Sequence, residues 1–163
     1  MATLYLICGM IGSGKTILAK QLETSRSAFR FSPDEWIKSL LVGESDTDER
    51  DRIRGPVEAL QWVVAQNLLK RGVSVVLENG FWSKEERTAY LDTAKGLGAN
   101  VELHYLDVPE DELWRRTERR NMVLPEGSFP VTRREFDESL RSFTPPDSAE
   151  LMTYNNHAEI SSR

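Results

Sequence analysis

The sequence Gly9-Met10-Ile11-Gly12-Ser13-Gly14-Lys15-Thr16 decides the fold of this chain. It matches the phosphate-binding P-loop pattern G-x-x-x-x-G-K-[ST] at every fixed position. The apolar residues 4–8 in front of it predict a buried strand, and residues 16–23 behind it carry apolar side chains at helical spacing. Because a P-loop joins a strand to a helix through a glycine-rich turn, this context indicates a nucleotide-phosphate site.

Each fixed residue of the loop has a chemical role. The glycines let the backbone bend around an anion, and the N–H groups of the turn and of the helix N-terminus point at it. Lys15 is long enough to reach the β- and γ-phosphates, and the Thr16 hydroxyl is the expected Mg²⁺ ligand. We therefore predict that residues 9–16 bind ATP together with Mg²⁺.

Composition describes an ordinary globular protein. Of 163 residues, 39% are hydrophobic and 29% are charged, and this length suits one core. We expect a single domain over residues 1–155 and a polar C-terminal tail over 156–163. The sequence predicts no membrane span and no signal peptide. Cys8 is the only cysteine, so no internal disulfide is expected. These features favour a cytoplasmic protein, either a monomer or a homodimer.

Charge bears on the choice of substrate. The net charge is −5, and the sequence has no lysine cluster or basic tail. Nucleic-acid partners usually require a basic stripe, so a nucleic-acid substrate is possible but not favoured. A small-molecule acceptor is the preferred expectation.

The remaining strands and helices alternate along the chain. Further strands are predicted at 28–32, 73–77 and 101–106, with a fifth, edge strand at 150–154. Helices are predicted to begin near five residues that start helices well, namely Pro33, Pro56, Ser83, Pro109 and Thr132. Residues 43–51 are polar and are interpreted as a loop. This order predicts a three-layer α/β P-loop NTPase fold, in which a mostly parallel sheet of about five strands has helices on both faces.

Two carboxylates follow predicted strands and should emerge beside the P-loop, because parallel strands share one C-terminal edge. Asp34 is the candidate base that accepts the proton of an acceptor hydroxyl. The alternative is a helix N-terminal residue that only stabilises the helix dipole. Glu78, with Asn79 beside it, is a candidate for binding Mg²⁺ through water or for positioning the acceptor. Its alternative is an exposed carboxylate at the end of a strand.

Arginines form the third candidate group. Arg116 and Arg120 are four residues apart and share one helix face, and Arg115 and Arg119 form a neighbouring pair. Arginines on a mobile lid can stabilise the charge of a phosphoryl group in transfer. The alternative is a solvated helix face paired with nearby glutamates. The loop 122–131, which contains proline and glycine, is expected to allow lid motion.

Aromatic residues near the strand ends suggest an apolar acceptor pocket. Trp82 follows Gly80 in a predicted turn and is the better candidate. Trp36 is a second candidate, for which core packing is equally plausible.

Together these stretches resemble a known family. Residues 6–16, 32–36, 76–87, 106–109 and 116–121 are similar to a bacterial family of small P-loop kinase-like proteins, often labelled AAA-type ATP-binding proteins. That family is related to polynucleotide 5′-kinases, chloramphenicol phosphotransferase and zeta toxins. The resemblance extends to about Tyr154.

The resemblance implies roles for particular positions. Lys15 and Thr16 match the phosphate and Mg²⁺ residues, and Asp34 matches the aspartate that acts as base in the polynucleotide kinases. The lid arginines are matched by Arg116 and Arg120, with Arg119 close to both. Position 78 departs from the pattern, because related sequences commonly have Asp there and this chain has a longer Glu.

The resemblance thus implies a kinase that transfers the γ-phosphoryl group of Mg·ATP to a hydroxyl of a small molecule. Two alternatives stay open. One is a polynucleotide 5′-hydroxyl kinase, and the other is a nucleotide-binding switch or accessory protein with little transfer activity.

Overall fold

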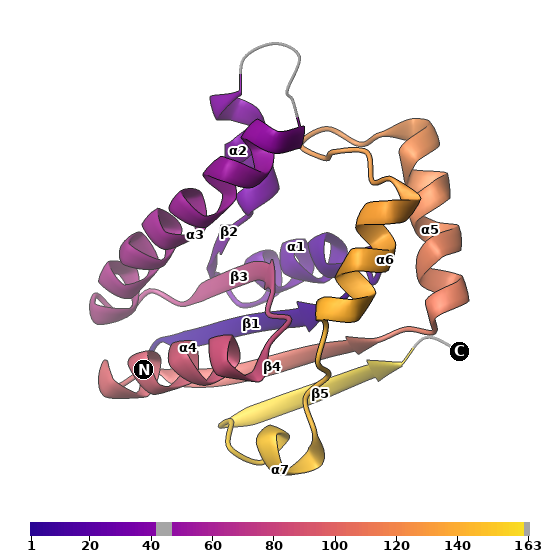
Figure 1. Cartoon of the computed structure of the whole chain (residues 1–163). Helices are drawn as coiled ribbons and strands as arrows, with labels where there is room; N and C mark the ends of the chain where they lie inside the picture. The colour runs from indigo at the N-terminus through magenta and orange to yellow at the C-terminus, as the bar shows by residue number, and fades with distance from the viewer. Residues whose placement is uncertain (42–46, 162–163) are drawn as a thin grey trace.

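The computed structural model describes residues 1–41 and 47–161 of the chain. Over these residues a five-stranded sheet is enclosed by helices (Figure 1). The described helices are α1 (Lys15–Ser25), α2 (Pro33–Leu40), α3 (Thr47–Lys70), α4 (Lys84–Gly96), α5 (Glu110–Val123), α6 (Arg133–Ser142) and α7 (Ser148–Leu151). Within the described part of the chain, none of them combines the length and apolar composition needed to cross a membrane.

The sheet is parallel throughout and places the P-loop at its centre. Its strands are β1 (Thr3–Gly9), β2 (Phe29–Phe31), β3 (Val75–Gly80), β4 (Asn100–Asp107) and β5 (Asn156–Ser161). They lie in the order β2-β3-β1-β4-β5, and each neighbouring pair is parallel. The loop after β1 therefore opens at the edge where β3 and β4 also end. The predicted α/β fold and the first four strands are confirmed.

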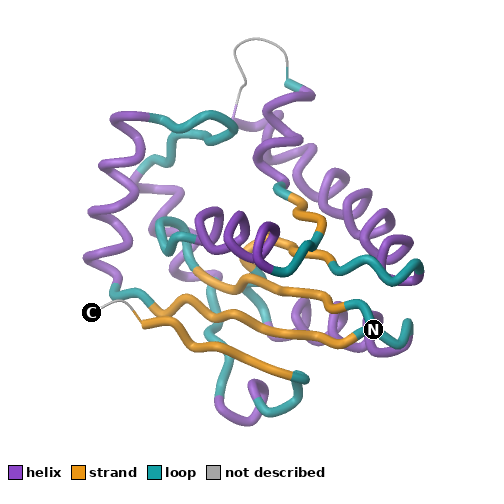
Figure 2. The backbone as a smooth tube through the Cα atoms, turned by 180° about the vertical axis from the view of Figure 1, so that it is seen from behind, coloured by secondary structure: helices purple, strands orange, loops and turns teal. Residues whose placement is uncertain are grey.

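Alternation along β1 divides the core between the two faces of the sheet. Leu4, Leu6 and Cys8 belong to the larger buried cluster, which includes residues of α3 and α4. Tyr5 and Ile7 belong to a second cluster with residues of α1. Figure 1 shows α1 behind the sheet, and Figure 2, from the opposite side, shows it in front. Because successive side chains of a strand point to opposite faces, one apolar strand serves both layers.

Helix α3 begins earlier than the sequence predicts. The expected loop at 43–51 is helical from Thr47, and its residues 43–46 lie outside the described part. Pro56, expected at the start of the helix, lies inside it. Proline there removes one backbone hydrogen bond. Tertiary contacts hold the added turns in place: Ile53 packs against a cluster containing Ile37 and Phe129.

The predicted edge strand at 150–154 is wrong, and the strand lies in the expected tail. Asp147 caps α7 by accepting a hydrogen bond from the Glu150 backbone N–H at 2.7 Å. Asn155 then joins the chain to β4, since its side-chain oxygen accepts from the Val101 N–H at 2.8 Å. β5 follows at Asn156–Ser161 and is almost entirely exposed, so it lacks the apolar alternation by which strands are recognised. Residues 162–163 of the expected tail lie outside the described part.

A buried arginine fixes the loop that leaves β3. The Arg87 side chain is 0% exposed and makes a two-pronged ion pair with Glu150, at 2.5 and 2.9 Å. Its remaining nitrogen donates to the backbone carbonyls of Phe81 and Thr144, each at 2.9 Å. One side chain of α4 therefore joins the end of β3, the segment after α6, and α7.

We predict that Arg87→Ala lowers the free energy of unfolding by about 3–5 kcal/mol, because it leaves the buried Glu150 carboxylate without a counter-charge. Urea unfolding followed by circular dichroism measures this change. The matched control is Lys84→Ala, at another residue of α4, which removes an exposed 3.4 Å ion pair with Asp147. This variant should lower the free energy of unfolding by less than about 1 kcal/mol. Equal losses in the two variants would contradict the anchoring role of Arg87.

Candidate active site

The P-loop leads from β1 into α1, and the helix begins without a side-chain cap. Gly14, at a φ of 99°, occupies the N-cap position. The first N–H groups of α1 therefore have no side-chain partner there and are available to an anion. Gly12, at a φ of 82°, packs so tightly on α5 that a Cβ would lie 2.5 Å from the Leu113 carbonyl oxygen. Glycine at this position lets the loop lie directly against α5.

Lys15 is held against its own loop. Its Nζ donates to the Gly9 carbonyl at 3.1 Å and to the Met10 carbonyl at 2.8 Å. Burial lowers the pKa of Lys15 to about 8; the charge of Asp34 opposes the shift and that of Arg120 adds to it. The charges of one carboxylate and one guanidinium thus both act on the ammonium group.

A cavity of about 1020 Å³ extends from the P-loop to α6. Its wall includes residues of the P-loop, α1, α2, α3, α4, α5 and α6, and of the end of β3. Within the loop, Ile11, Gly12, Gly14, Lys15 and Thr16 line it. Gly9, Met10 and Ser13 do not, and Met10 is buried in a cluster with Leu113 and Phe136. The loop backbone thus supplies the cavity floor, while part of the loop belongs to the core.

Asp34 lines this cavity at the start of α2 and forms an ion pair with Arg54 of α3. The other terminal nitrogen of Arg54 lies 3.5 Å from Glu58, one turn further along α3. Asp34 is 46% exposed, so its carboxylate is held by Arg54 and is still accessible from the cavity. Ser32 caps α2 by accepting a hydrogen bond from the Glu35 backbone N–H at 3.5 Å.

Glu78 reaches the cavity from the end of β3 but is largely buried, with a side chain that is 4% exposed. Its Oε1 accepts from Arg30 at 2.9 Å, and Arg30 also pairs with Glu35 at 2.7 Å and with Glu23 at 3.3 Å. Burial raises the pKa of Glu78 above its ordinary value, and Arg30 opposes this. The expected exposed carboxylate is therefore an internal ion pair. Asn79 lines the cavity beside it.

The three lid arginines all line the cavity from α5, but their surroundings differ. Arg116 is neutralised by Glu112 at 2.6 Å, and Arg119 is exposed. Arg120 has no ion-pair partner among the described residues, and its Nε is buried without a hydrogen bond there. Burial lowers the pKa of Arg120, which Asp34 opposes. Arg115 does not line the cavity and pairs with Glu112. Among the lid arginines, Arg120 is thus the half-buried cation that has no ion pair in the described part of the chain.

Of the two tryptophans predicted to form an acceptor pocket, one lines the cavity and the other does not. Trp82 lines the cavity, and its indole N–H donates to the Gly9 carbonyl at 3.2 Å, so it links the β3 end to the P-loop. Trp36 does not line the cavity. Its ring contacts Phe31 edge-on at 5.7 Å between centroids, in the hydrophobic core. The core-packing alternative therefore describes the position of Trp36.

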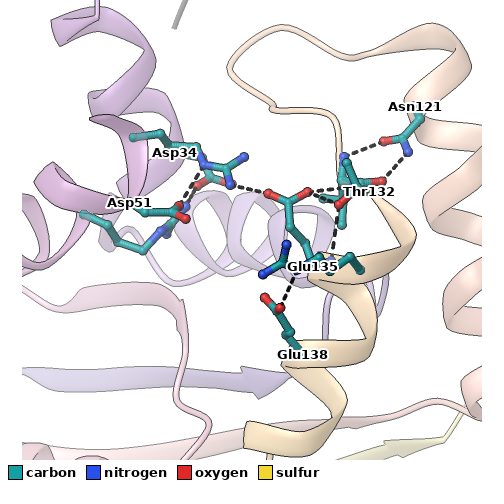
Figure 3. Close-up of polar contacts among 10 residues, drawn as sticks. Asp34, Asp51, Asn121, Thr132, Glu135 and Glu138 are labelled. Atoms are coloured by element: carbon teal, nitrogen blue, oxygen red, sulfur yellow. Dashed lines mark hydrogen bonds and ion pairs between the residues drawn. The ribbon is translucent and has the colours of Figure 1, made fainter. Parts of the chain in front are cut away.

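Sequence reasoning missed the residues that α3 and α4 contribute. Arg50, Arg54 and Glu58 project from the part of α3 near or before Pro56, and Glu86 lies in the first turn of α4; all line the cavity. Arg50 pairs with Glu135 of α6 at 2.5 Å. Figure 3 shows Asp34 and Asp51, of α2 and α3, on the opposite side of the view from Glu135 and Glu138 of α6. A helix pattern extended through Pro56 would have indicated that Arg54 and Glu58 share a face.

The parallel sheet, the P-loop and the cavity at the strand ends define the chain as an α/β P-loop protein with a kinase-like fold. A family model described as an AAA domain matches residues 4–146, so the chain belongs to that family. The resemblance noted in the sequence is confirmed.

Solved structures share this fold at low identity. A provisionally assigned kinase from Chloroflexus aurantiacus gives a TM-score of 0.77 at 17% identity, covering 98% of this chain and 88% of that one. APS kinase from Mycobacterium tuberculosis, in complex with AMPPNP and APS, gives 0.60 at 14%, covering 97% and 88%. A fungal RNA kinase gives 0.64 at 12%, covering 99% of this chain and 39% of that one. Small-molecule and RNA kinases therefore share the fold.

We predict that Glu58→Gln stabilises the protein at pH above 7 and has no such effect near pH 4.5. Burial raises the pKa of Glu58 from its ordinary 4.5 to about 7; Arg54 opposes this, and Glu86 and Asp34 add to it. The folded state therefore holds a proton that the unfolded state loses, so stability falls as pH rises from 4.5 to 7. Glutamine removes this loss, a gain of about 3 kcal/mol.

Urea unfolding of wild type and variant across this pH range measures the difference. The control is Glu85→Gln, an exposed residue of α4 that does not line the cavity, and it should follow the wild type. A Glu58→Gln curve parallel to wild type at every pH would show that Glu58 ionises as an ordinary carboxyl group.

Proposed function

We propose that this protein is an ATP- and Mg²⁺-dependent phosphotransferase that acts on a hydroxyl group of a small molecule. The observation that carries this proposal is that one cavity is lined by the P-loop, by the Asp34 carboxylate and by Arg120. The pKa of Lys15 responds to both, and all three residues line one cavity. A phosphate held by Lys15 would share this cavity with a cation and with a carboxylate for the acceptor.

The donor side is the part of the cavity formed by the P-loop and α5. The uncapped N–H groups of α1 and the Lys15 ammonium bind the β- and γ-phosphates of ATP. Arg120 stabilises the negative charge of the phosphoryl group during transfer, because its guanidinium has no ion-pair partner among the described residues. Arg116, already paired with Glu112, is less available for this role.

Thr16 fits the expected Mg²⁺ site, since it is exposed, lines the cavity and lies in the first turn of α1 directly after Lys15. In the described part of the chain no group of three acidic, histidine or cysteine residues is placed to hold a metal ion. This suits Mg²⁺, which P-loop enzymes hold with few protein ligands and with substrate phosphates. When bound, Mg²⁺ neutralises charge on the phosphates.

Asp34 acts on the acceptor. Its carboxylate accepts the hydroxyl proton as the acceptor oxygen forms a bond to the γ-phosphorus, while the bond from that phosphorus to the ADP oxygen breaks. Arg54 orients the carboxylate through the ion pair. ADP leaves with the electron pair of the broken bond, so the step is balanced.

Two alternatives have distinct tests. The fungal RNA kinase supports a polynucleotide 5′-hydroxyl kinase, which an assay with radiolabelled ATP and 5′-hydroxyl oligonucleotides would detect. A nucleotide-binding switch would hydrolyse ATP at the same rate with and without a mixture of metabolites. A kinase of small molecules would release ADP faster when its acceptor is in the mixture.

We predict that Lys15→Ala lowers acceptor-dependent ADP release by at least about 100-fold, because the donor phosphates lose a cation. Asp34→Asn should lower it by about 100- to 10 000-fold while leaving ATP affinity nearly unchanged, because asparagine cannot accept the hydroxyl proton. Coupled ADP assays and titration with a fluorescent ATP analogue measure the two quantities. Full turnover by Asp34→Asn would show that another group is the base.

We also predict that Arg120→Ala lowers kcat by about 1000-fold with a smaller change in ATP affinity, because its charge acts mainly in the transition state. Arg115→Ala is the control, since Arg115 lies on the same helix, is exposed and does not line the cavity. Steady-state kinetics distinguish them. A larger loss in Arg116→Ala than in Arg120→Ala would transfer the role to Arg116.

A further inference from the structure

Helix α3 presents an apolar strip to solvent. Leu60, Val63 and Val64 are 56%, 54% and 36% exposed, although they lie inside a long helix. Figure 1 and Figure 2, which view the molecule from opposite sides, both show α3 at its outer margin. Single exposed apolar side chains are ordinary, but neighbours on one helix face form a patch that can bind another surface.

The exposed residues of α3 repeat at the spacing of paired helices. In alternating steps of four and three residues, exposed positions follow one another at Pro56, Leu60, Val63, Asn67 and Lys70. This alternation puts them on one face, as in the a and d positions of a coiled coil. Glu49, seven residues before Pro56, continues the face and is exposed, while Ile53 between them packs in the cluster with Phe129. The α3 seam is defined here as residues 49, 56, 60, 63, 67 and 70.

The other faces of α3 are already in use. Residues that pack on the rest of the molecule are buried, namely Val57, Gln61, Ala65 and Leu69. A second set lines the cavity, namely Arg50, Arg54 and Glu58. None of these residues belongs to the α3 seam, so a partner on the seam would not fill the candidate active site.

Opposite charges stand at the two ends of the seam. Glu49 lies in the first turn of α3 and Lys70 in the last. The Glu49 side chain is 51% exposed, and Lys70 is exposed without an ion pair among the described residues. The two residues are 21 positions apart, about 31 Å along the helix axis, so they cannot pair within one chain. Their midpoint falls between Ala59 and Leu60, in the apolar part of the seam.

A surface with this pattern complements itself. If a second copy of α3 packs antiparallel, with a two-fold axis at the midpoint, Glu49 meets the partner's Lys70 at both ends. The apolar residues between Pro56 and Val64 then meet each other at the centre, and the helix dipoles oppose favourably. A two-fold contact of one patch with itself is the commonest way in which soluble proteins form homo-oligomers. One identical partner therefore satisfies both the charges and the apolar strip.

We propose that the α3 seam is the interface of a two-fold symmetric homodimer, in which the two α3 helices pack antiparallel. One pair of helices makes a small interface, so the dimer is weak, with a Kd of about 1–100 µM. This proposal is independent of the proposed function, because no seam residue lines the cavity.

Sedimentation equilibrium of the full-length protein between about 1 and 500 µM, a range that brackets this Kd, tests the proposal. We expect the average mass to rise with concentration from the 18.6 kDa of one chain toward twice that value. A mass that stays at one chain throughout the range overturns the homodimer and leaves the seam to a different partner.

Variants at the centre of the seam test its position. Leu60→Glu and Val63→Glu should each raise the Kd more than about tenfold, because two-fold symmetry brings each new charge into the apolar centre twice. Both residues are exposed, so the variants should keep the circular dichroism spectrum and unfolding midpoint of the wild type. Met152→Glu is the matched control, since Met152 is 78% exposed and lies outside α3. A Kd that is unchanged in both seam variants, or raised equally in the control, overturns the proposal.

Charge exchange tests the antiparallel arrangement. Glu49→Lys and Lys70→Glu should each raise the Kd by about three- to tenfold, because each places like charges at both ends of the seam. The double variant should return to within about threefold of the wild type, since the opposite charges meet again. The distance between the two positions in one chain excludes rescue within a monomer. Single variants that weaken the dimer without recovery in the double variant would overturn the antiparallel pairing.

Discussion

The buried Arg87 guanidinium constrains the geometry on which the candidate site depends. A charge without access to water is tolerated only when its hydrogen-bonding groups are paired, and Arg87 meets this condition with Glu150 and with the carbonyls of Phe81 and Thr144. The Phe81 carbonyl also accepts from Cys8 at 3.4 Å. Because Phe81 is fixed in this way, the next residue, Trp82, reaches the Gly9 carbonyl at the start of the P-loop. A contact deep in the core thus determines the shape of the cavity wall.

Sequence predicted most reliably what local chemistry determines. The P-loop, the first four strands and the capping box of Thr132 depend on residues a few positions apart, and the structure contains them. The parallel sheet followed from the alternation of strands and helices. β5 was misplaced because its order comes from pairing with β4, while its exposed residues carry no periodic signal. The extension of α3 before Pro56 likewise depends on contacts with distant segments such as Phe129.

In the candidate site, too, residues placed by local sequence were predicted and residues placed by distant contacts were not. Asp34, Trp82 and the lid arginines were predicted because strand ends and helix spacing place them at one edge of the sheet, and all of them line the cavity. Arg54 and Glu58 were not, since their helix was expected to start later. Burial of Glu78 against Arg30 could not be read from residues 48 positions apart. Trp36 shows a further limit, because an aromatic residue near a strand end suits a core and a pocket equally well.

Many charged side chains of the molecule gather around one cavity. A net charge of −5 suggested only that a nucleic-acid substrate was disfavoured. In the structure, cations of the P-loop, α1, α3 and α5 line one cavity together with carboxylates of α2, α3, α4, α6 and β3. Packing alone does not favour this arrangement: burial raises the pKa of Glu58 and Glu86, so their ionisation opposes folding. Proteins tolerate such locally unfavourable charges mainly at functional sites. The cost of ionising Glu58 and Glu86 therefore indicates a role in the cavity rather than in the stability of the fold.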